Sequence, residues 1–260
     1  MLRAQLCGKR PLGHLLLLLW SAWALWSPAV ARAEGAELTR LIDSPTAGLV
    51  EKGKFAFDMR LFQEGGLMGQ LNAGALKRLT IGVSYGGERI IGDRTIDWYA
   101  RLEAGVRYRI IEESQTWPAL VIGYETQGYG AYAGKRYQVK SKGVFLSFSK
   151  NYLSSLGQFG VHGGVNLTRE DADGDDDPSG WVGADKSINE DLVLVGEYDL
   201  GLDDDGSESL GTGEGYLNAG ARWAVSPQLT IGFYMKNLLG NGAGNREASR
   251  ELSVLYSEEF

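Results

Sequence analysis

The sequence contains very little cysteine or histidine. Its 260 residues include one cysteine, Cys7, and two histidines, His14 and His162. A disulfide framework and thiolate chemistry in the body of the chain are therefore excluded. Long apolar runs are scarce too. After residue 33 no stretch approaches the roughly 18 consecutive apolar residues of a membrane-spanning helix.

The first 33 residues have the organisation of a secretory signal peptide. Arg3, Lys9 and Arg10 precede the apolar stretch HLLLLLWSAWALW (14–26), and Ala31-Arg32-Ala33 supplies a cleavage site. The apolar run is shorter than the roughly 20 residues that span a bilayer. We therefore predict that residues 1–33 are removed on export.

The rest of the chain is strongly acidic. Four of the 26 Lys and Arg residues and none of the 33 acidic residues lie in the first 33 positions, which leaves 22 basic against 33 acidic side chains and a net charge of −11. A charge of this sign repels phosphate groups. We therefore expect no nucleic-acid partner.

What is abundant is two-residue alternation of apolar and polar side chains. In LTIGVSY (79–85) the apolar residues hold the odd positions, while Thr, Gly and Ser hold the even ones. This period is typical of strands with one apolar face. Twelve segments show it, at about 53–62, 66–74, 79–88, 96–111, 117–127, 136–150, 157–168, 179–187, 190–200, 213–225, 228–238 and 248–260.

The connections between these segments alternate in kind. Short ones such as ALKR (75–78) and SPQ (226–228) alternate with longer glycine-rich or acidic ones such as REDADGDDDPSG (169–180). Short turns at one end and long loops at the other are typical of outer-membrane barrels. The sequence therefore predicts an all-β fold, a twelve-stranded antiparallel up-and-down transmembrane β-barrel over residues 53–260. Residues 34–52 are expected to form an N-terminal periplasmic lead.

The polar face of the strands decides between a membrane barrel and a soluble sandwich. It carries charges of both signs, favours Arg over Lys, and is rich in glycine, which suits a narrow lumen where opposed charges meet. The residues predicted to line this lumen are Asp58, Arg60, Arg101, Glu103, Arg107, Arg109, Glu125, His162, Glu197, Asp199, Arg222 and Lys236.

The apolar face has aromatic residues near the strand ends, as expected for the aromatic girdles of a membrane barrel. They include Phe55, Tyr85, Trp98, Tyr108, Trp117, Tyr124, Tyr152, Trp181, Tyr198, Trp223 and Tyr256. The last segment alternates and ends in phenylalanine. Leu252, Val254, Tyr256 and Phe260 resemble the C-terminal sorting signal of bacterial outer-membrane barrels, which implies recognition by the barrel-assembly machinery.

The segment Ser44-Pro45-Thr46-Ala47-Gly48, just ahead of the first strand, resembles the entry to the barrel of YjbH-like proteins. The stretches IGVSYGGERIIGD, GVHGGVNLTRED and LNAGARWAVSPQLTIGFYMKNLL are similar to hairpins of short, barrel-only relatives of that family. The resemblance implies an outer-membrane barrel associated with exopolysaccharide production. Members linked to exopolysaccharide are much longer than this chain.

Enzymatic and metal chemistry have weak sequence support. The only base candidate after export, His162, has the parity of the polar face and so points into the barrel, away from lipid. DADGDDDP (171–178) places acidic residues around a glycine, but no glutamate follows at the bidentate position of an EF-hand. With LDDDGSES (202–209) it fits a solvated acidic loop or a weak divalent-cation site that bridges lipopolysaccharide. We predict no enzyme and no cofactor.

Three hypotheses of function remain open. The first is a narrow channel for small or acidic-sugar solutes, or a component of polysaccharide export, in a bacterial outer membrane with both chain ends in the periplasm. The second is a structural or assembly barrel whose lumen is closed by its own charges. The third is a soluble periplasmic β-domain that binds a ligand. The expected partners are outer-membrane lipid, lipopolysaccharide and the assembly machinery.

Overall fold

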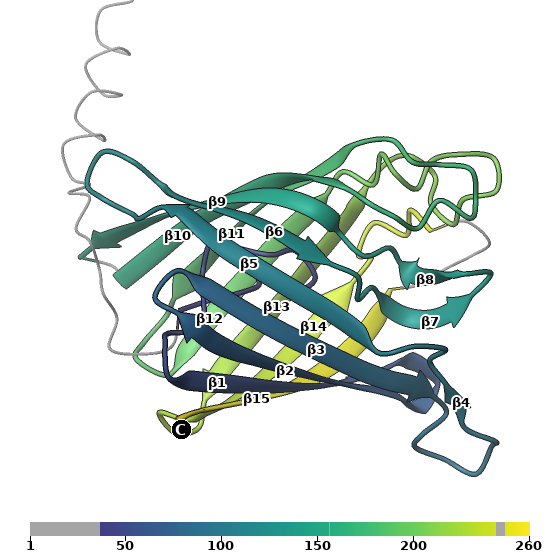
Figure 1. Ribbon diagram of the computed structural model, residues 1–260, viewed down its shortest axis with the longest axis horizontal. Helices are drawn as coiled ribbons and strands as arrows, with labels where there is room; N and C mark the ends of the chain where they lie inside the picture. Colours follow the sequence, from purple (N-terminus) through teal and green to yellow (C-terminus); the bar gives the residue numbers. More distant parts are fainter. Residues whose placement is uncertain (1–36, 156, 243–247) are drawn as a thin grey trace, which may run out of the picture.

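A computed structural model describes residues 37–155, 157–242 and 248–260 (Figure 1). The predicted signal peptide, with Cys7 and His14, and the first three residues of the predicted lead lie outside the described residues. In the described part of the chain, no helix is long and apolar enough to cross a membrane.

Twelve long strands form one closed antiparallel barrel, as the sequence predicted. They are β1 (Lys54–Phe62), β2 (Gly66–Leu76), β3 (Leu79–Glu88), β5 (Glu103–Ile111), β6 (Ala119–Glu125), β9 (Gly143–Ser154), β10 (Gly157–Leu167), β11 (Ser179–Ser187), β12 (Leu192–Asp199), β13 (Tyr216–Ala224), β14 (Leu229–Lys236) and β15 (Ser249–Glu259). A short 3-10 helix, η1 (Gln63–Gly65), joins β1 to β2.

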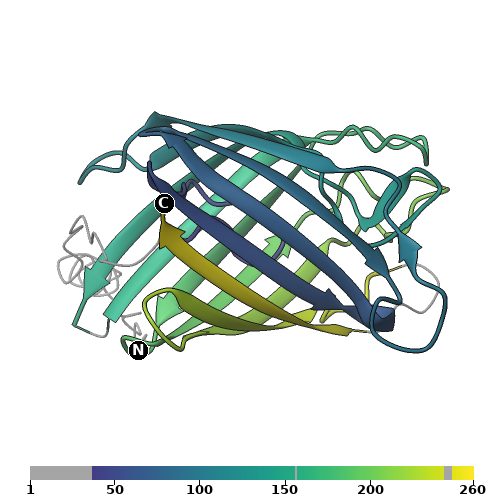
Figure 2. The same cartoon turned by 60° about the horizontal axis from the view of Figure 1, so that its bottom comes forward.

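The last strand closes the barrel by pairing with the first. The register of β1 with β15 runs from Lys54 opposite Glu259 to Leu61 opposite Leu252, and the two strands lie side by side in Figure 2. At the start of β1, the Phe55 ring lies 6.2 Å from Tyr256 and 6.5 Å from Phe260, measured between centroids. Closure removes the two free edges that the sheet of twelve long strands would otherwise have.

Two predicted segments are divided in the structure. The segment 96–111 contains a two-residue strand, β4 (Asp97–Trp98), separated from β5. The segment 136–150 begins with β8 (Arg136–Val139), which pairs with β7 (Tyr129–Ala133) in a separate two-stranded sheet. Residues 128–135, between the predicted segments 117–127 and 136–150, were expected to form a loop. We call residues 129–139 the cap hairpin, because they lie at the long-loop end of the barrel.

The two faces of the wall differ as the alternation predicted. Apolar side chains point outward and remain exposed. Their exposed fractions lie between 38 and 56% for Ile81, Val106, Ile122, Leu146, Val182, Leu194 and Phe233. The charged side chains of alternate positions are buried. Trp181 is a correction to the predicted girdle: it is 1% exposed and faces the interior.

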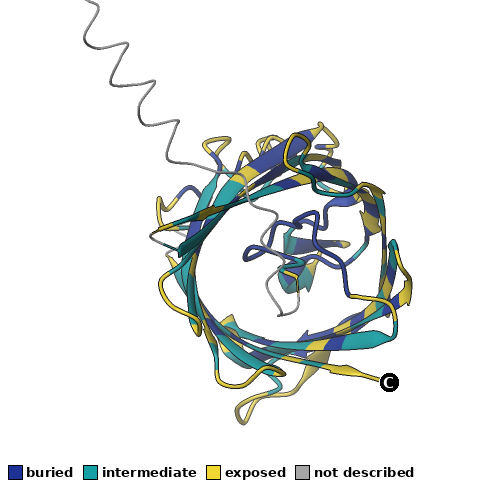
Figure 3. Cartoon of the chain, turned by 90° about the vertical axis from the view of Figure 1, so that its left-hand side faces the viewer, coloured by how far each residue is buried: buried dark blue, intermediate teal, exposed yellow. Residues whose placement is uncertain are grey.

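The interior of the barrel is occupied by residues 37–50. Leu41 to Val50 are all buried, and Figure 3 shows this segment in dark blue inside the ring of strands. The predicted periplasmic lead, over its described residues, therefore does not extend away from the barrel. We call residues 37–50 the lead.

Candidate functional site in the barrel lumen

The lead enters the lumen as a hairpin. The amide of Leu41 donates to the carbonyl of Ser44 at 2.9 Å, and the amide of Thr46 donates to Thr39 at 3.2 Å. The turn at 41–44 is its inner tip. Val50 and Thr80 bond at the short-turn end of the wall, where the lead continues into β1. Glu37, the first described residue, accepts hydrogen bonds from the amide of Leu49 at 3.0 Å and from Arg109 at 3.1 Å. Both described ends of the hairpin therefore lie near the short-turn end.

Glu197 of β12 binds the tip. Its carboxylate accepts hydrogen bonds from the amides of Ile42, Asp43 and Ser44 at 3.0, 2.9 and 2.9 Å. Asn218 donates a fourth, at 2.9 Å. Hydrogen bonds to an ionised acceptor are the stronger kind. A wall carboxylate is thus used to satisfy three consecutive backbone donors of the lead.

The side chain of Asp43 at the tip lies between two wall cations. Its carboxylate is 2.6 Å from a guanidinium nitrogen of Arg60 and 2.7 Å from the ammonium of Lys236. Both cations also pair with Glu251, at 3.5 and 3.0 Å. All four side chains are buried, so each charge depends on the others for compensation.

Three further wall arginines hold carbonyl groups of the lead. Arg222 donates to the carbonyls of Arg40 and Leu41 at 2.8 and 2.6 Å, Arg107 donates to Thr39, and Arg109 donates to Ala47 at 2.8 Å. Arg107 also pairs with Glu125, which Arg40 of the lead contacts at 3.1 Å. The arginines therefore replace the water that would otherwise hydrate the lead's backbone.

The returning half of the hairpin packs on an apolar part of the wall. Ala47 and Leu49 form one cluster with Ala119, Val121, Phe145 and Trp181. The indole nitrogen of Trp181 donates to the carbonyl of Pro45 at 3.1 Å. Small wall residues make the room: a Cβ on Gly183 would lie 2.5 Å from a methyl carbon of Leu41, and one on Gly164 would lie 2.3 Å from the Trp181 ring.

His162 belongs to a chain of hydrogen-bonded polar side chains that also contacts the lead. Its Nδ1 is 2.7 Å from Oγ of Ser149, and its Nε2 is 2.7 Å from a carboxylate oxygen of Asp185. The spacing resembles a Ser–His–Asp relay, but Oγ of Ser149 accepts the amide hydrogen of Ala47 at 2.8 Å. The serine is therefore engaged with the lead. Ser84, within the G-x-S-x-G spacing of residues 82–86, lies inside strand β3 instead of on a strand-to-helix turn.

The structure places eleven of the twelve predicted lumen residues at the inner wall. Arg60, Glu103, Arg107, Glu125, His162, Glu197, Asp199 and Lys236 are buried, and Asp58, Arg109 and Arg222 are partly buried. Arg101 differs, since it precedes β5 and its side chain is 53% exposed, 2.6 Å from Glu103. Asp199 pairs with Lys142.

Several residues of this site were absent from the sequence prediction. They are Asp43, Thr80, Ser147, Ser149, Trp181 and Glu251. Thr80, Ser147 and Ser149 share the inward parity of their strands, so the alternation contained a signal for them. The Ser-Pro-Thr-Ala-Gly segment, 44–48, gave no such signal, because nothing in its pattern indicates that it enters the barrel.

Two acidic loops meet above the long-loop end of the lumen, around cations of the chain itself. The ammonium of Lys140 bonds Asp173 at 2.8 Å and the carbonyls of Asp175 and Asp203 at 2.8 and 2.6 Å. Arg136 of the cap hairpin pairs with Asp173 and, at 2.8 Å, with Asp204. These two cations supply positive charge that a bound divalent ion would otherwise provide.

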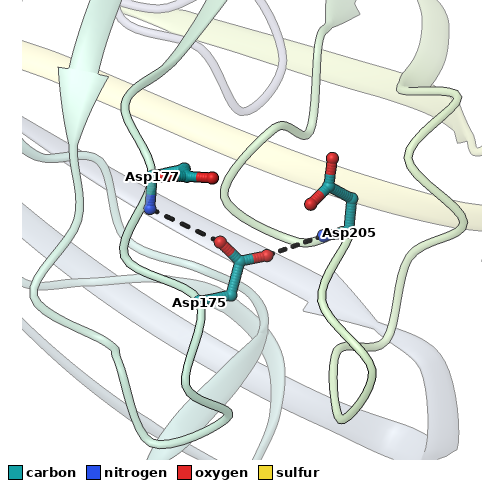
Figure 4. A group of neighbouring side chains, drawn as sticks. All are labelled: Asp175, Asp177 and Asp205. Atoms are coloured by element: carbon teal, nitrogen blue, oxygen red, sulfur yellow. Dashed lines mark hydrogen bonds between the residues drawn. The ribbon is translucent and has the colours of Figure 1, made fainter.

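The same loops bring Asp175, Asp177 and Asp205 together, with carboxylate oxygens within 4.8 Å of one another (Figure 4). Oxygen ligands of this kind suit calcium. Asp175, however, already accepts the amides of Asp205 and Gly206 at 2.8 and 2.9 Å and of Asp177 at 3.4 Å. The weak cation site predicted for 171–178 and 202–209 remains a prediction.

The loop network is expected to loosen in acid. Burial opposes ionisation of Asp173, but hydrogen bonds from Lys140 and Ser209 outweigh it and lower its pKa. For Asp175, burial is outweighed by backbone hydrogen bonds from Asp205 and Gly206, and its pKa is lowered too. A carboxylate whose pKa is lowered on folding stabilises the fold at pH values above 3.8, its pKa in the unfolded chain. This stabilisation is lost as the pH falls through the pKa of the folded state.

Burial has the opposite effect on Glu170, whose pKa is raised from 4.5 although the amides of Tyr137 and Ser141 favour ionisation. The stabilisation that protonated Glu170 contributes is complete below pH 4.5 and is lost as the pH rises through its raised pKa. Below pH 3.8 the contribution of Glu170 no longer changes with pH, so the change in loop stability is set by Asp173 and Asp175. Protease sensitivity of the 168–178 and 200–215 loops should rise on acidification from pH 5 to about pH 3. Unchanged cleavage across that range would contradict these ion pairs.

A cavity of about 60 Å³ lies between the lead and the cap hairpin, lined in part by Asp43, Tyr129, Asn218, Lys236 and Glu251. It has room for a few water molecules. A solute larger than that has no place there while the lead is seated.

No protein-family model matches the chain, and no curated protein matches it. Among solved structures, the KdgM porin is 9% identical, with 79% of this chain and 99% of that chain covered and a TM-score of 0.49. The NanC porin is 10% identical, with 79% and 99% covered and a TM-score of 0.41. The outer membrane channel DcaP of Acinetobacter baumannii is 9% identical, with 79% and 96% covered and a TM-score of 0.32. Similarities this low indicate neither a substrate nor an activity.

Proposed function

We propose that this protein is a bacterial outer-membrane barrel, without enzymatic activity, whose lumen is closed by its own lead and conducts only when the lead is displaced. The observation that carries the proposal is the seating of residues 41–47 on Glu197, Arg60, Arg222 and Ser149. These wall groups bind the lead's backbone, which a water-filled pore lining does not need to do. The displaced state would expose them to a passing solute.

The outer surface supports the membrane location. Exposed apolar side chains follow alternate positions of neighbouring strands, as with Tyr108, Ile122 and Leu146 at 47, 44 and 38%. A continuous apolar surface of this kind is unfavourable in water, whereas a closed barrel in hydrocarbon requires it. This argues against a soluble periplasmic domain. Outer-membrane lipid and lipopolysaccharide are then the immediate partners, and Leu252, Val254, Tyr256 and Phe260 would serve recognition by the assembly machinery.

A permanently closed structural barrel is the second candidate. It is favoured by wall charges that pair with one another without the lead, such as Arg107 with Glu125 and Lys142 with Asp199. The polysaccharide role implied by the resemblance to YjbH-like proteins has less support. Ser44 to Gly48, which carry that resemblance, lie buried in the lead, where they seat it against the wall.

Deletion of residues 37–50 tests the proposal. In planar bilayers the intact barrel should show little or no steady ion current, and the deletion variant should show stable current steps. Folding of both proteins is checked by their heat-dependent mobility on gels. A folded deletion variant that remains silent would favour the permanently closed barrel, and an intact protein with large steady currents would contradict closure by the lead.

A further inference from the structure

The cap hairpin reaches into the lumen and meets the lead. Tyr129, at the start of β7, is 4% exposed. Its ring centroid lies 4.3 Å from the guanidinium carbon of Arg60, 5.4 Å from that of Arg40, and 5.3 Å from the ammonium of Lys236. One aromatic ring from the long-loop end thus contacts three cations in the middle of the barrel.

These three cations also seat the lead. Arg40 belongs to the lead, while Arg60 and Lys236 both pair with Asp43 at its tip. The face of a buried aromatic ring attracts cations, and this attraction offsets part of the repulsion among three neighbouring positive charges. Withdrawal of Tyr129 would therefore weaken the group of charges that binds the tip.

The ring of Tyr129, and not its hydroxyl, makes this contact. The hydroxyl is buried and has no hydrogen-bond partner in the described protein. Burial raises the pKa of Tyr129 to about 12 despite the nearby positive charges of Arg40 and Arg60, so the phenol is neutral at neutral pH. A phenylalanine at this position would keep the contact with the cations.

The remainder of the cap hairpin is fixed to the loops at that end. The hydroxyl of Tyr99 donates to the carbonyl of Gly130 at 2.7 Å, and the ring of Tyr99 lies 5.1 Å from that of Tyr137. The amide of Tyr137 donates to Glu170 at 2.7 Å. A displacement of these loops would carry the hairpin, and Tyr129 with it.

We propose that the cap hairpin and the lead form an interlock through Tyr129, so that events at the long-loop end control how firmly the lead is held at the other. The inference rests on the proposed closure of the lumen by the lead. The two inserts come from opposite ends of the barrel and share one cluster of charges. Release of either one therefore weakens the seating of the other.

A single thiol in the lead tests the interlock. In a Cys7→Ser background, Ser44→Cys introduces the only cysteine at a fully buried position of the tip. Its reaction rate with a membrane-impermeant maleimide is measured in folded, lipid-inserted protein. Tyr129→Ala should raise this rate about tenfold, as expected for loss of buried cation–ring contacts. Tyr129→Phe should leave the rate within about twofold of the parent, since its ring is retained.

The reverse effect is measured at the cap hairpin. Glu197→Gln, which weakens the seat of the lead, should speed trypsin cleavage after Lys135, an exposed residue of the hairpin turn. The matched charge change Glu64→Gln, at an exposed position in the connection between β1 and β2, should leave the cleavage rate unchanged. An unchanged thiol rate in Tyr129→Ala, or an equal rise in Tyr129→Phe, would overturn the interlock. The ion current through the lead-deletion variant tests the proposed closure of the lumen separately, because it does not depend on Tyr129.

Discussion

Replacement of Glu197 with glutamine is expected to unseat the lead. The wild-type carboxylate accepts three backbone amides of the tip and the amide of Asn218. Glutamine keeps one acceptor oxygen and turns an NH2 group toward backbone donors. Hydrogen bonds to a charged group contribute about 1.5–3 kcal/mol each. A loss of about 3 kcal/mol would raise the population with a displaced lead about 100-fold.

The measurement for Glu197→Gln is the ion current through single barrels. Brief openings should become frequent, while heat-dependent mobility shows that the barrel itself remains folded. Glu64→Gln is the matched control, because Glu64 is exposed and its ion pair is with Arg94, at 3.3 Å, away from the lead. If Glu197→Gln stays as silent as the control, the carboxylate does not hold the tip.

An arginine at position 122 is expected to destabilise the barrel strongly. Ile122 is the central residue of β6, is 44% exposed, and lies between Tyr108 and Leu146 on the neighbouring strands. If hydrocarbon surrounds this surface, Ile122→Arg should cost about 2–4 kcal/mol, the range for a cation near the bilayer midplane. In water the same exposed substitution would cost far less.

Ile188→Arg provides the control for position 122. Ile188 is 54% exposed but lies in the turn between β11 and β12. Near the interface an arginine costs only about 0–1 kcal/mol. Urea unfolding of both variants in lipid vesicles compares the two positions directly. Equal effects at the two positions would argue that no membrane surrounds the barrel.

Alternation in the sequence was sufficient to predict the barrel wall. Register and closure follow from that pattern, because a one-residue slip would turn every charged side chain of a strand outward. This is why Arg60, Arg107 and Glu197 could be placed on the inner face from parity alone. Arg101 was misplaced because the alternation continues through residues 99–102, which in the structure leave the sheet between β4 and β5.

The content of the lumen could not be predicted in the same way. The lead has no strand period, and its contacts join residues far apart in sequence, such as Ile42 with Glu197 and Ala47 with Ser149. Trp181 was assigned to the outer girdle because its ring resembles those of the interface aromatics. Its place inside depends on a partner, Pro45, that local sequence does not identify. Tyr129 was missed for a similar reason, since its strand was assigned to a loop.

A cross-link between the lead and the wall is the most direct measurement of closure. The amide nitrogen of Ala47 lies 2.8 Å from Oγ of Ser149. With Cys7 replaced by serine, the pair Ala47→Cys and Ser149→Cys should form a disulfide in high yield in folded, lipid-inserted protein, visible as a shift on non-reducing gels. The pair Ser44→Cys and Ile188→Cys, from the tip and an outer turn, should not. Failure of the first pair to cross-link in a folded barrel would contradict the account, because it would place the lead outside the lumen.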